Sequence, residues 1–188
     1  MTDNLFAAGA VTVAVFVIGF VAMIACFYRR VRQGQAVIRT GMGGSQVSFI
    51  GLVSIPVAHR IETIDLTVKK LTTAFSDDNS LKTRDGIEVE TTAAFLVSVN
   101  REKDDILRVA GEHGAEKASA LETIQKLFAA RFTEALKAAV EECDFETIDA
   151  QREKFRGIVR DKIGPDLKGY KLHEIALDHF GKRDTTPD

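Results

Sequence analysis

Residues 87–99 read IEVETTAAFLVSV, and this stretch decides the fold. Its odd-numbered positions carry apolar or small side chains, whereas its even-numbered positions are mostly polar. Because successive side chains of a strand point to opposite faces, the pattern predicts a long strand with one buried face and one largely polar face. Leu96 is the one large apolar residue on the second face. The stretch therefore predicts an antiparallel sheet that is exposed on one side.

Shorter strand patterns precede the long strand. We expect strands at 59–66 and 67–75, followed by a polar break at 76–80. Further upstream, residues 35–40 predict a strand that ends in a glycine cluster, Gly41, Gly43 and Gly44. A phosphate-binding loop would need a lysine beside these glycines, and none follows them. The cluster therefore predicts a hairpin turn.

Downstream of the long strand the apolar period changes from two to three or four. This change predicts a short helix at 104–109 and a long helix at 115–142. A second helix is expected at 146–163, ended by Gly164-Pro165. Strands first, then helices and a closing strand, indicate an α+β fold.

The closing strand is expected at 171–180. Strict alternation along it would place two sets of side chains on opposite faces. One set is Leu172, Glu174, Ala176, Asp178 and Phe180, and the other is His173, Ile175, Leu177 and His179.

An uncharged run near the start of the chain, residues 5–28, reads LFAAGAVTVAVFVIGFVAMIACFY. A helix of 24 residues is about 36 Å long, which is enough to cross a hydrocarbon core of roughly 30 Å. The run is too long for a cleaved signal peptide and has no basic segment before it. The missing basic segment also counts against a lipoprotein signal ending at Cys26. We therefore predict a retained transmembrane helix.

The charges beside this run predict its orientation. Arg29, Arg30 and Arg32 follow it, and no basic side chain precedes it. The positive-inside rule places the main domain in the cytoplasm and the N-terminus outside. The three arginines are also expected to contact anionic lipid headgroups.

A second uncharged segment, residues 47–58, has two readings. It is either a pair of buried strands across a turn at Gly51 or a hairpin whose apolar tip dips into the inner leaflet. The tip residues in the second reading are Phe49, Ile50, Leu52 and Val53.

Composition excludes several classes of function. The chain has 25 basic and 27 acidic side chains, and one of the acidic ones, Asp3, precedes residue 29. Residues 29–188 therefore balance at 25 − 26 = −1, which does not fit a nucleic-acid-binding surface. With only Cys26 and Cys143, the chain has neither a disulfide framework nor a zinc knuckle.

No catalytic, cofactor-binding or metal-binding residue is predicted. His173 and His179 would stand roughly 20 Å apart on a strand, too far to share a metal. A calcium loop at 77–88 would need a glycine at its sixth position, where Lys82 stands. The remaining candidates fit helix capping or solvated faces; they are Ser119, the pair Glu88 and Glu90, and the pair Glu141 and Glu142.

Several segments, in their order and spacing, resemble the SPFH (band 7) domain family and its bacterial flotillin-like branch. The segments that carry the resemblance are Tyr28-Arg29-Arg30, residues 36–44 (AVIRTGMGG), Ile55-Pro56, His59, residues 81–87 (LKTRDGI), the helical pair, and residues 172–180 (LHEIALDHF).

The resemblance implies a scaffold of membrane microdomains in the bacterial cell (inner) membrane, and not an enzyme. Members assemble side by side into large rings or cages. The expected partners are membrane lipids, other copies of the chain, and either a small β-barrel membrane partner or a membrane protease. The alternative function is a regulatory subunit that binds a membrane protease or another membrane enzyme. A membrane-anchored hydrolase would need a nucleophile that the sequence does not reveal.

The resemblance also implies a domain plan. The anchor at 5–28 would be followed by a membrane-proximal β-rich subdomain at 29–105 and a helical α/β subdomain at 106–180. An apolar membrane contact in the first subdomain is a habit of the family. Flotillins continue into a long coiled coil, whereas the tail at 181–188 begins no heptad. We expect either a coiled coil beyond Asp188 or a short member of the family.

Overall fold

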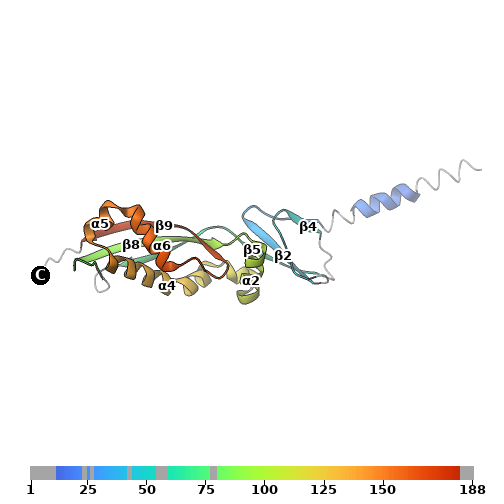
Figure 1. Ribbon diagram of the computed structural model, residues 1–188. Helices are drawn as coiled ribbons and strands as arrows, with labels where there is room; N and C mark the ends of the chain where they lie inside the picture. Colours follow the sequence, from blue (N-terminus) through green and yellow to red (C-terminus); the bar gives the residue numbers. More distant parts are fainter. Residues whose placement is uncertain are drawn as a thin grey trace, which may run out of the picture. The chain divides into compact units, whose positions relative to one another are not determined.

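The computed structural model of the protein describes residues 12–22, 25, 28–41, 44–53, 59–76 and 80–182. The chain forms two compact units, Met1–Thr63 and Ile64–Asp188 (Figure 1). The predicted subdomain boundary at 105/106 falls inside the second unit. The units divide earlier because the long strand and the helices that cover it share one core.

The described part of the predicted membrane span is helical. Residues 12–22 and 25 have helical backbone, and the large apolar side chains among them are exposed, namely Val13, Val15, Phe16, Val17, Ile18, Phe20 and Val21. Within the described residues, no helix combines the length and the apolar character that crossing a bilayer requires. Residues 5–11, 23, 24, 26 and 27 lie outside the described residues, so the span stays a prediction. Tyr28, predicted as its last residue, instead begins a strand.

Short antiparallel strands build the first unit. They are β1 (Tyr28–Arg30), β2 (Gln35–Gly41), β3 (Gln46–Ser48), β4 (Gly51–Val53) and β5 (His59–Asp65), whose last two residues belong to the second unit. One sheet has the order β3-β2-β5, and β1 pairs with β4. The buried apolar side chains of the first unit are Ala36, Val37, Ile38 and Val47.

The glycine cluster forms the predicted hairpin turn. β2 and β3 are antiparallel, with Ile38 opposite Val47. The Gly44 N–H donates to the Gly41 carbonyl at 3.0 Å, and Gly44 has φ +89°. A residue with a side chain adopts that backbone angle at a cost, which is why glycine stands there.

The long strand is the centre of the second unit, as predicted. β8 (Glu88–Val99) pairs with β6 (Lys69–Phe75) and β7 (Leu81–Lys82) along one edge and with β9 (Tyr170–Lys182) along the other. All of these pairs are antiparallel. The predicted inward positions of β8 are buried: Val89, Thr91, Ala93, Phe95, Val97 and Val99.

The helices of the second unit are more broken than predicted. They are α2 (Lys103–His113), α3 (Ala115–Ala118), α4 (Leu121–Glu142), α5 (Phe145–Ala150) and α6 (Arg152–Ile163). The expected 104–109 helix continues to His113 and ends at Gly114, which has φ +80°. The expected 146–163 helix bends at Gln151, which leaves helical geometry with φ −126° and ψ 53°. It ends at Ile163, as predicted.

Ser119 explains why the expected 115–142 helix is two helices. Its side chain is buried, and the N-cap position of α4 is taken by Ala120 and not by Ser119. Ser119 Oγ accepts the Asp65 N–H at 3.3 Å and donates to the Glu116 carbonyl at 3.2 Å. This tie to the end of β5 holds the chain out of a continuous helix.

The core of the second unit lies between α4 and the inward face of β8. Phe95 stacks on Phe132 with ring centroids 4.6 Å apart, and Phe128 lies 5.5 Å from Phe132. Tyr170 meets Phe128 edge to face at 5.1 Å. Its hydroxyl donates to the Ala118 carbonyl at 2.8 Å. Burial raises the pKa of Tyr170 to about 12.

The helices α4 and α6 lie beside β8 and β9 (Figure 1). α6 packs against both α4 and β9.

The strict alternation predicted for the closing strand is wrong. The pairing of β9 with β8 shifts register twice, so that His173 and Asp178 are extra residues in β9. Each bulge reverses the alternation. The residues opposite the inward face of β8 are therefore Tyr170, Leu172, Ile175, Leu177, Phe180 and Lys182. Phe180 consequently stacks on Phe145 at 5.3 Å.

Candidate membrane-contact site

A tight turn between β3 and β4 presents two apolar side chains to solvent. Ser48 Oγ donates to the Gly51 carbonyl at 2.9 Å and closes the turn. Phe49 is 39% exposed and Ile50 is 84% exposed. The turn therefore lies at Phe49-Ile50, and not at Gly51 as the buried-strand reading assumed. In the described part of the segment, Val47 is buried, whereas Phe49 and Ile50 are exposed.

The arginine segment pairs directly with the strand that follows this tip. β1 and β4 are antiparallel, with Arg29 opposite Leu52 and Arg30 opposite Gly51. The Val31 N–H adds a hydrogen bond to the Ile50 carbonyl at 3.3 Å. Two sequence features that were predicted separately, the basic exit and the apolar tip, are thus neighbours in one small sheet.

A second turn fixes where the arginine segment ends. The Gln35 N–H donates to the Arg32 carbonyl at 3.2 Å, and Gly34 between them has φ +78°. Arg32 is exposed at this turn. An exposed apolar turn whose backbone neighbour is an arginine-rich strand fits the boundary between lipid headgroups and acyl chains, where apolar burial and attraction to anionic lipid act together. We call Arg29, Arg30, Arg32, Phe49, Ile50, Leu52 and Val53 the tip site.

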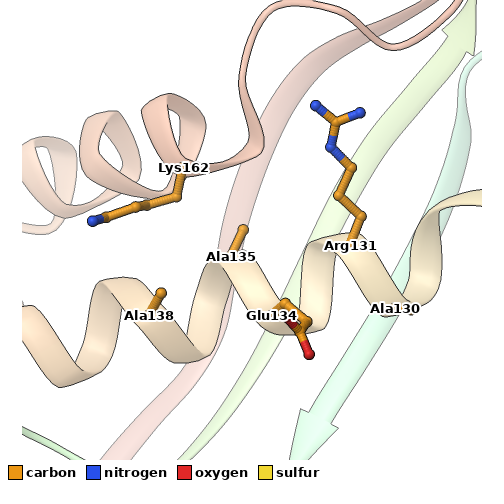
Figure 2. A pocket seen from close by; sticks show the side chains of 6 residues that line it. All are labelled: Ala130, Arg131, Glu134, Ala135, Ala138 and Lys162. Atoms are coloured by element: carbon orange, nitrogen blue, oxygen red, sulfur yellow. The ribbon is translucent and has the colours of Figure 1, made fainter.

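A groove between α4 and α6 offers little chemistry of its own (Figure 2). It is a hollow of ≈ 470 Å³ lined by Ala130, Arg131, Glu134, Ala135, Ala138 and Lys162. Figure 2 shows Arg131 reaching from α4 toward the segment after α6. Its guanidinium donates to the Ile163 carbonyl and, at 2.9 Å, to the Asp166 carbonyl. Lys162 pairs with Glu142 at 2.6 Å. Arg131 therefore binds the carbonyls at the end of α6, and Lys162 links α6 to α4.

Two of the glutamates considered as catalytic candidates form ion pairs, and Cys143 is buried. Glu88 pairs with Lys82 at 3.4 Å, and Glu141 with Lys137 at 4.0 Å. Burial raises the pKa of the Cys143 thiol, which disfavours a reactive thiolate. Residues 77–79 lie outside the described residues.

Comparison with known proteins decides the family. The model of the SPFH domain / Band 7 family matches residues 29–181, from the arginine segment to the end of β9. The chain belongs to this family. It is also 31% identical, over 170 residues, to the flotillin family inner membrane protein YqiK of Escherichia coli (strain K12). That match covers 89% of this chain and 30% of the relative. The predicted relationship to the bacterial flotillin-like proteins is therefore confirmed.

Proposed function

We propose that this SPFH-domain protein is a membrane-anchored scaffold of the bacterial inner membrane. Copies assemble side by side and corral lipids or membrane proteins. Membership of the SPFH family supports the scaffold role. The name of the Escherichia coli relative, an inner membrane protein, supports the location.

The proposal rests on the pairing of β1 with β4, which brings the arginine segment beside an exposed apolar tip. Residues 5–28 form the first attachment, a helix that crosses the bilayer with the N-terminus outside. The tip site forms the second attachment on the inner leaflet. Two attachments fix the tilt of the first unit against the membrane, and a fixed tilt lets neighbours pack side by side.

The expected free energies indicate that the tip site orients the protein on the membrane, whereas the transmembrane helix keeps it in the membrane. Fully burying an isoleucine or phenylalanine side chain contributes about 1.5–3 kcal/mol. Each arginine near an anionic surface contributes about 1 kcal/mol. These sums are small beside the effectively irreversible insertion of a transmembrane helix. Once the helix tethers the unit, the tip acts at high local concentration and a weak contact suffices.

Charging the tip tests this proposal. We expect Phe49→Asp combined with Ile50→Asp to leave the chain in the membrane fraction but to reduce its cross-linking into large assemblies. Leu121→Asp is the matched control, because Leu121 is exposed and an acidic residue suits the first turn of α4. Unchanged cross-linking of the charged-tip variant would remove the second attachment. A strictly monomeric particle of the complete protein in mild detergent would contradict the scaffold itself.

Thiol labelling tests the orientation. In a variant without Cys26 and Cys143, a cysteine replacing Thr2 should react with a membrane-impermeant reagent on intact cells, and one replacing Thr185 should not. The reverse pattern would place the SPFH domain outside the cytoplasm.

Purification from membranes distinguishes the proposed partners. Other copies of the chain, with or without a small β-barrel membrane protein, fit the scaffold. A membrane protease in fixed stoichiometry would make the protein the regulatory subunit of that enzyme.

A further inference from the structure

A small hollow at one end of the second unit is unusually basic. It has a volume of ≈ 120 Å³ and is lined by residues of the β5–β6 connection, the end of β8 and the start of β9. The lining residues are Leu66, Val68, Ser98, Val99, Asn100, Arg101, Lys171 and His173. Three of them are basic, and none is a carboxylate.

The two long cations of this hollow are unpaired in the part of the chain that the structure describes. No ion pair or side-chain hydrogen bond joins Arg101 or Lys171 to another described residue. Other basic side chains of the second unit form ion pairs with carboxylates, as Lys69 does with Asp65 at 2.7 Å. Side chains that attract anions thus gather here without an ion pair to any carboxylate among the described residues.

A serine and a histidine complete the lining. Ser98 Oγ lies 2.8 Å from His173 Nε2, a contact made possible by the bulge that places His173 in β9 as an extra residue. Arg160 donates to the His173 carbonyl at 3.2 Å and adds another positive charge behind the strand. The carboxylate of Asp105, beside this hollow through Asn100, accepts from Asn100 Nδ2 at 2.7 Å and pairs with Arg108 at 3.8 Å.

These groups suit binding better than catalysis. Ser98 is only 4% exposed, and its hydroxyl also donates to the Val99 carbonyl at 3.2 Å, so it is poorly placed as a nucleophile. Ammonium, guanidinium and protonated imidazole groups, which Lys171, Arg101 and His173 can supply, are strong donors to phosphate oxygens.

The size of the hollow limits the ligand. Pockets for drug-sized molecules are about 300–1,000 Å³, and the share of liquid volume of one water is about 30 Å³. The hollow of ≈ 120 Å³ therefore suits a single phosphate group. We infer that Arg101, Lys171 and His173 form a binding site for a phosphate-type oxyanion, either free phosphate or the phosphate of a lipid headgroup. This inference does not depend on the proposed scaffold function.

Thermal unfolding with added phosphate tests the site. The full chain in nonionic detergent is followed by circular dichroism in sodium phosphate and in sodium chloride of equal ionic strength. Phosphate that binds the folded chain raises the unfolding midpoint, and the concentration dependence gives the affinity. We expect Arg101→Gln combined with Lys171→Gln to weaken that affinity about tenfold or more, since charge-assisted hydrogen bonds are lost.

Lys126→Gln combined with Lys137→Gln is the control. Both lysines are exposed on α4, so this variant loses the same charge and reports the general effect of phosphate on stability. We expect it to match the wild type. If the Arg101/Lys171 variant also matches the wild type, the hollow is not a phosphate site.

A water-soluble short-chain phosphatidic acid distinguishes the two sources. Affinity at least about tenfold above that of inorganic phosphate, lost in the Arg101/Lys171 variant, would assign a lipid headgroup. Equal affinities would assign free phosphate. Binding of neither ligand to the wild type would overturn the inference, while the cross-linking result at the tip would stand unaffected.

Discussion

At the scale of single residues, Gly169 has no room for a side chain. Its φ is +91°, and a Cβ there would lie 2.6 Å from Val109 Cγ2 and 3.1 Å from the Asp105 carbonyl oxygen. Its own carbonyl accepts the Asn100 N–H at 2.9 Å. The turn before β9 can therefore pack on α2 only with glycine at this position.

We expect Gly169→Ala to lower the free energy of unfolding by about 1–3 kcal/mol, because overpacking and an unfavourable φ act together. Gly157→Ala is the matched control, since Gly157 lies inside α6 with open space around it. Alanine there should raise stability by up to about 1 kcal/mol. Urea unfolding of both variants measures the difference, and equal effects would contradict this account of Gly169.

Asp85 makes stability depend on acid pH. The Thr83 hydroxyl donates to Asp85 Oδ1, and the Phe145 N–H donates at 3.4 Å. These hydrogen bonds, the one from Thr83 first, hold the pKa of Asp85 below its ordinary value. A carboxylate with a lowered pKa stabilises the fold at pH values above its unfolded pKa, near 4, and loses that contribution as the pH falls through the folded pKa.

We expect Asp85→Asn to have a lower urea midpoint than the wild type at pH 7. The difference should shrink as the pH falls from about 4 through the lowered folded pKa of Asp85, below which the wild-type carboxyl is protonated in the folded chain as well. A difference of constant size across this range would show that Asp85 acts through shape alone.

At the scale of elements, the packing of α4 on β8 forms the core of the second unit. Phe132 is fully buried and touches Phe95 and Phe128. We expect Phe132→Ala to lower the free energy of unfolding by about 3–5 kcal/mol, because it leaves a cavity in the core. Phe49→Ala, at the exposed tip, should change it by less than about 0.5 kcal/mol. Similar losses at the two positions, measured by urea unfolding, would contradict the assignment of the core.

Elements with a long regular period could be predicted from the sequence. The period of two along 87–99 predicted β8, and the period of three to four along 115–142 predicted a helix that includes all of α4. The bulges of β9 could not be predicted, because they arise from its pairing with β8 and leave no mark in its own alternation. The break at Ser119 likewise depends on Asp65, which is 54 positions away.

The tip site was predicted only in part. Its residues followed from charge and apolarity, but β1 and β4 are three residues long each and carry no detectable period. Their pairing, which makes neighbours of Arg29 and Leu52, needed the structure. The basic hollow was missed because its cations lie 70 positions apart in the sequence and meet only through the β8–β9 pairing.

At the scale of the whole molecule, the account assigns a different task to each unit. We propose that the first unit carries the attachments to the membrane, whereas the second carries the inferred oxyanion site. The whole proposal depends on whether the apolar tip enters the lipid.

Fluorescence quenching at the tip tests that claim most directly. In a background without Cys26 and Cys143, Ile50→Cys is labelled with an environment-sensitive fluorophore and the chain is reconstituted in vesicles that contain lipids with quencher groups on their acyl chains. Leu121→Cys, on an exposed position of the second unit, is the control. The account predicts quenching and a blue-shifted emission at position 50, and neither at position 121. An unquenched, water-like emission at position 50 in membrane-bound protein would contradict it.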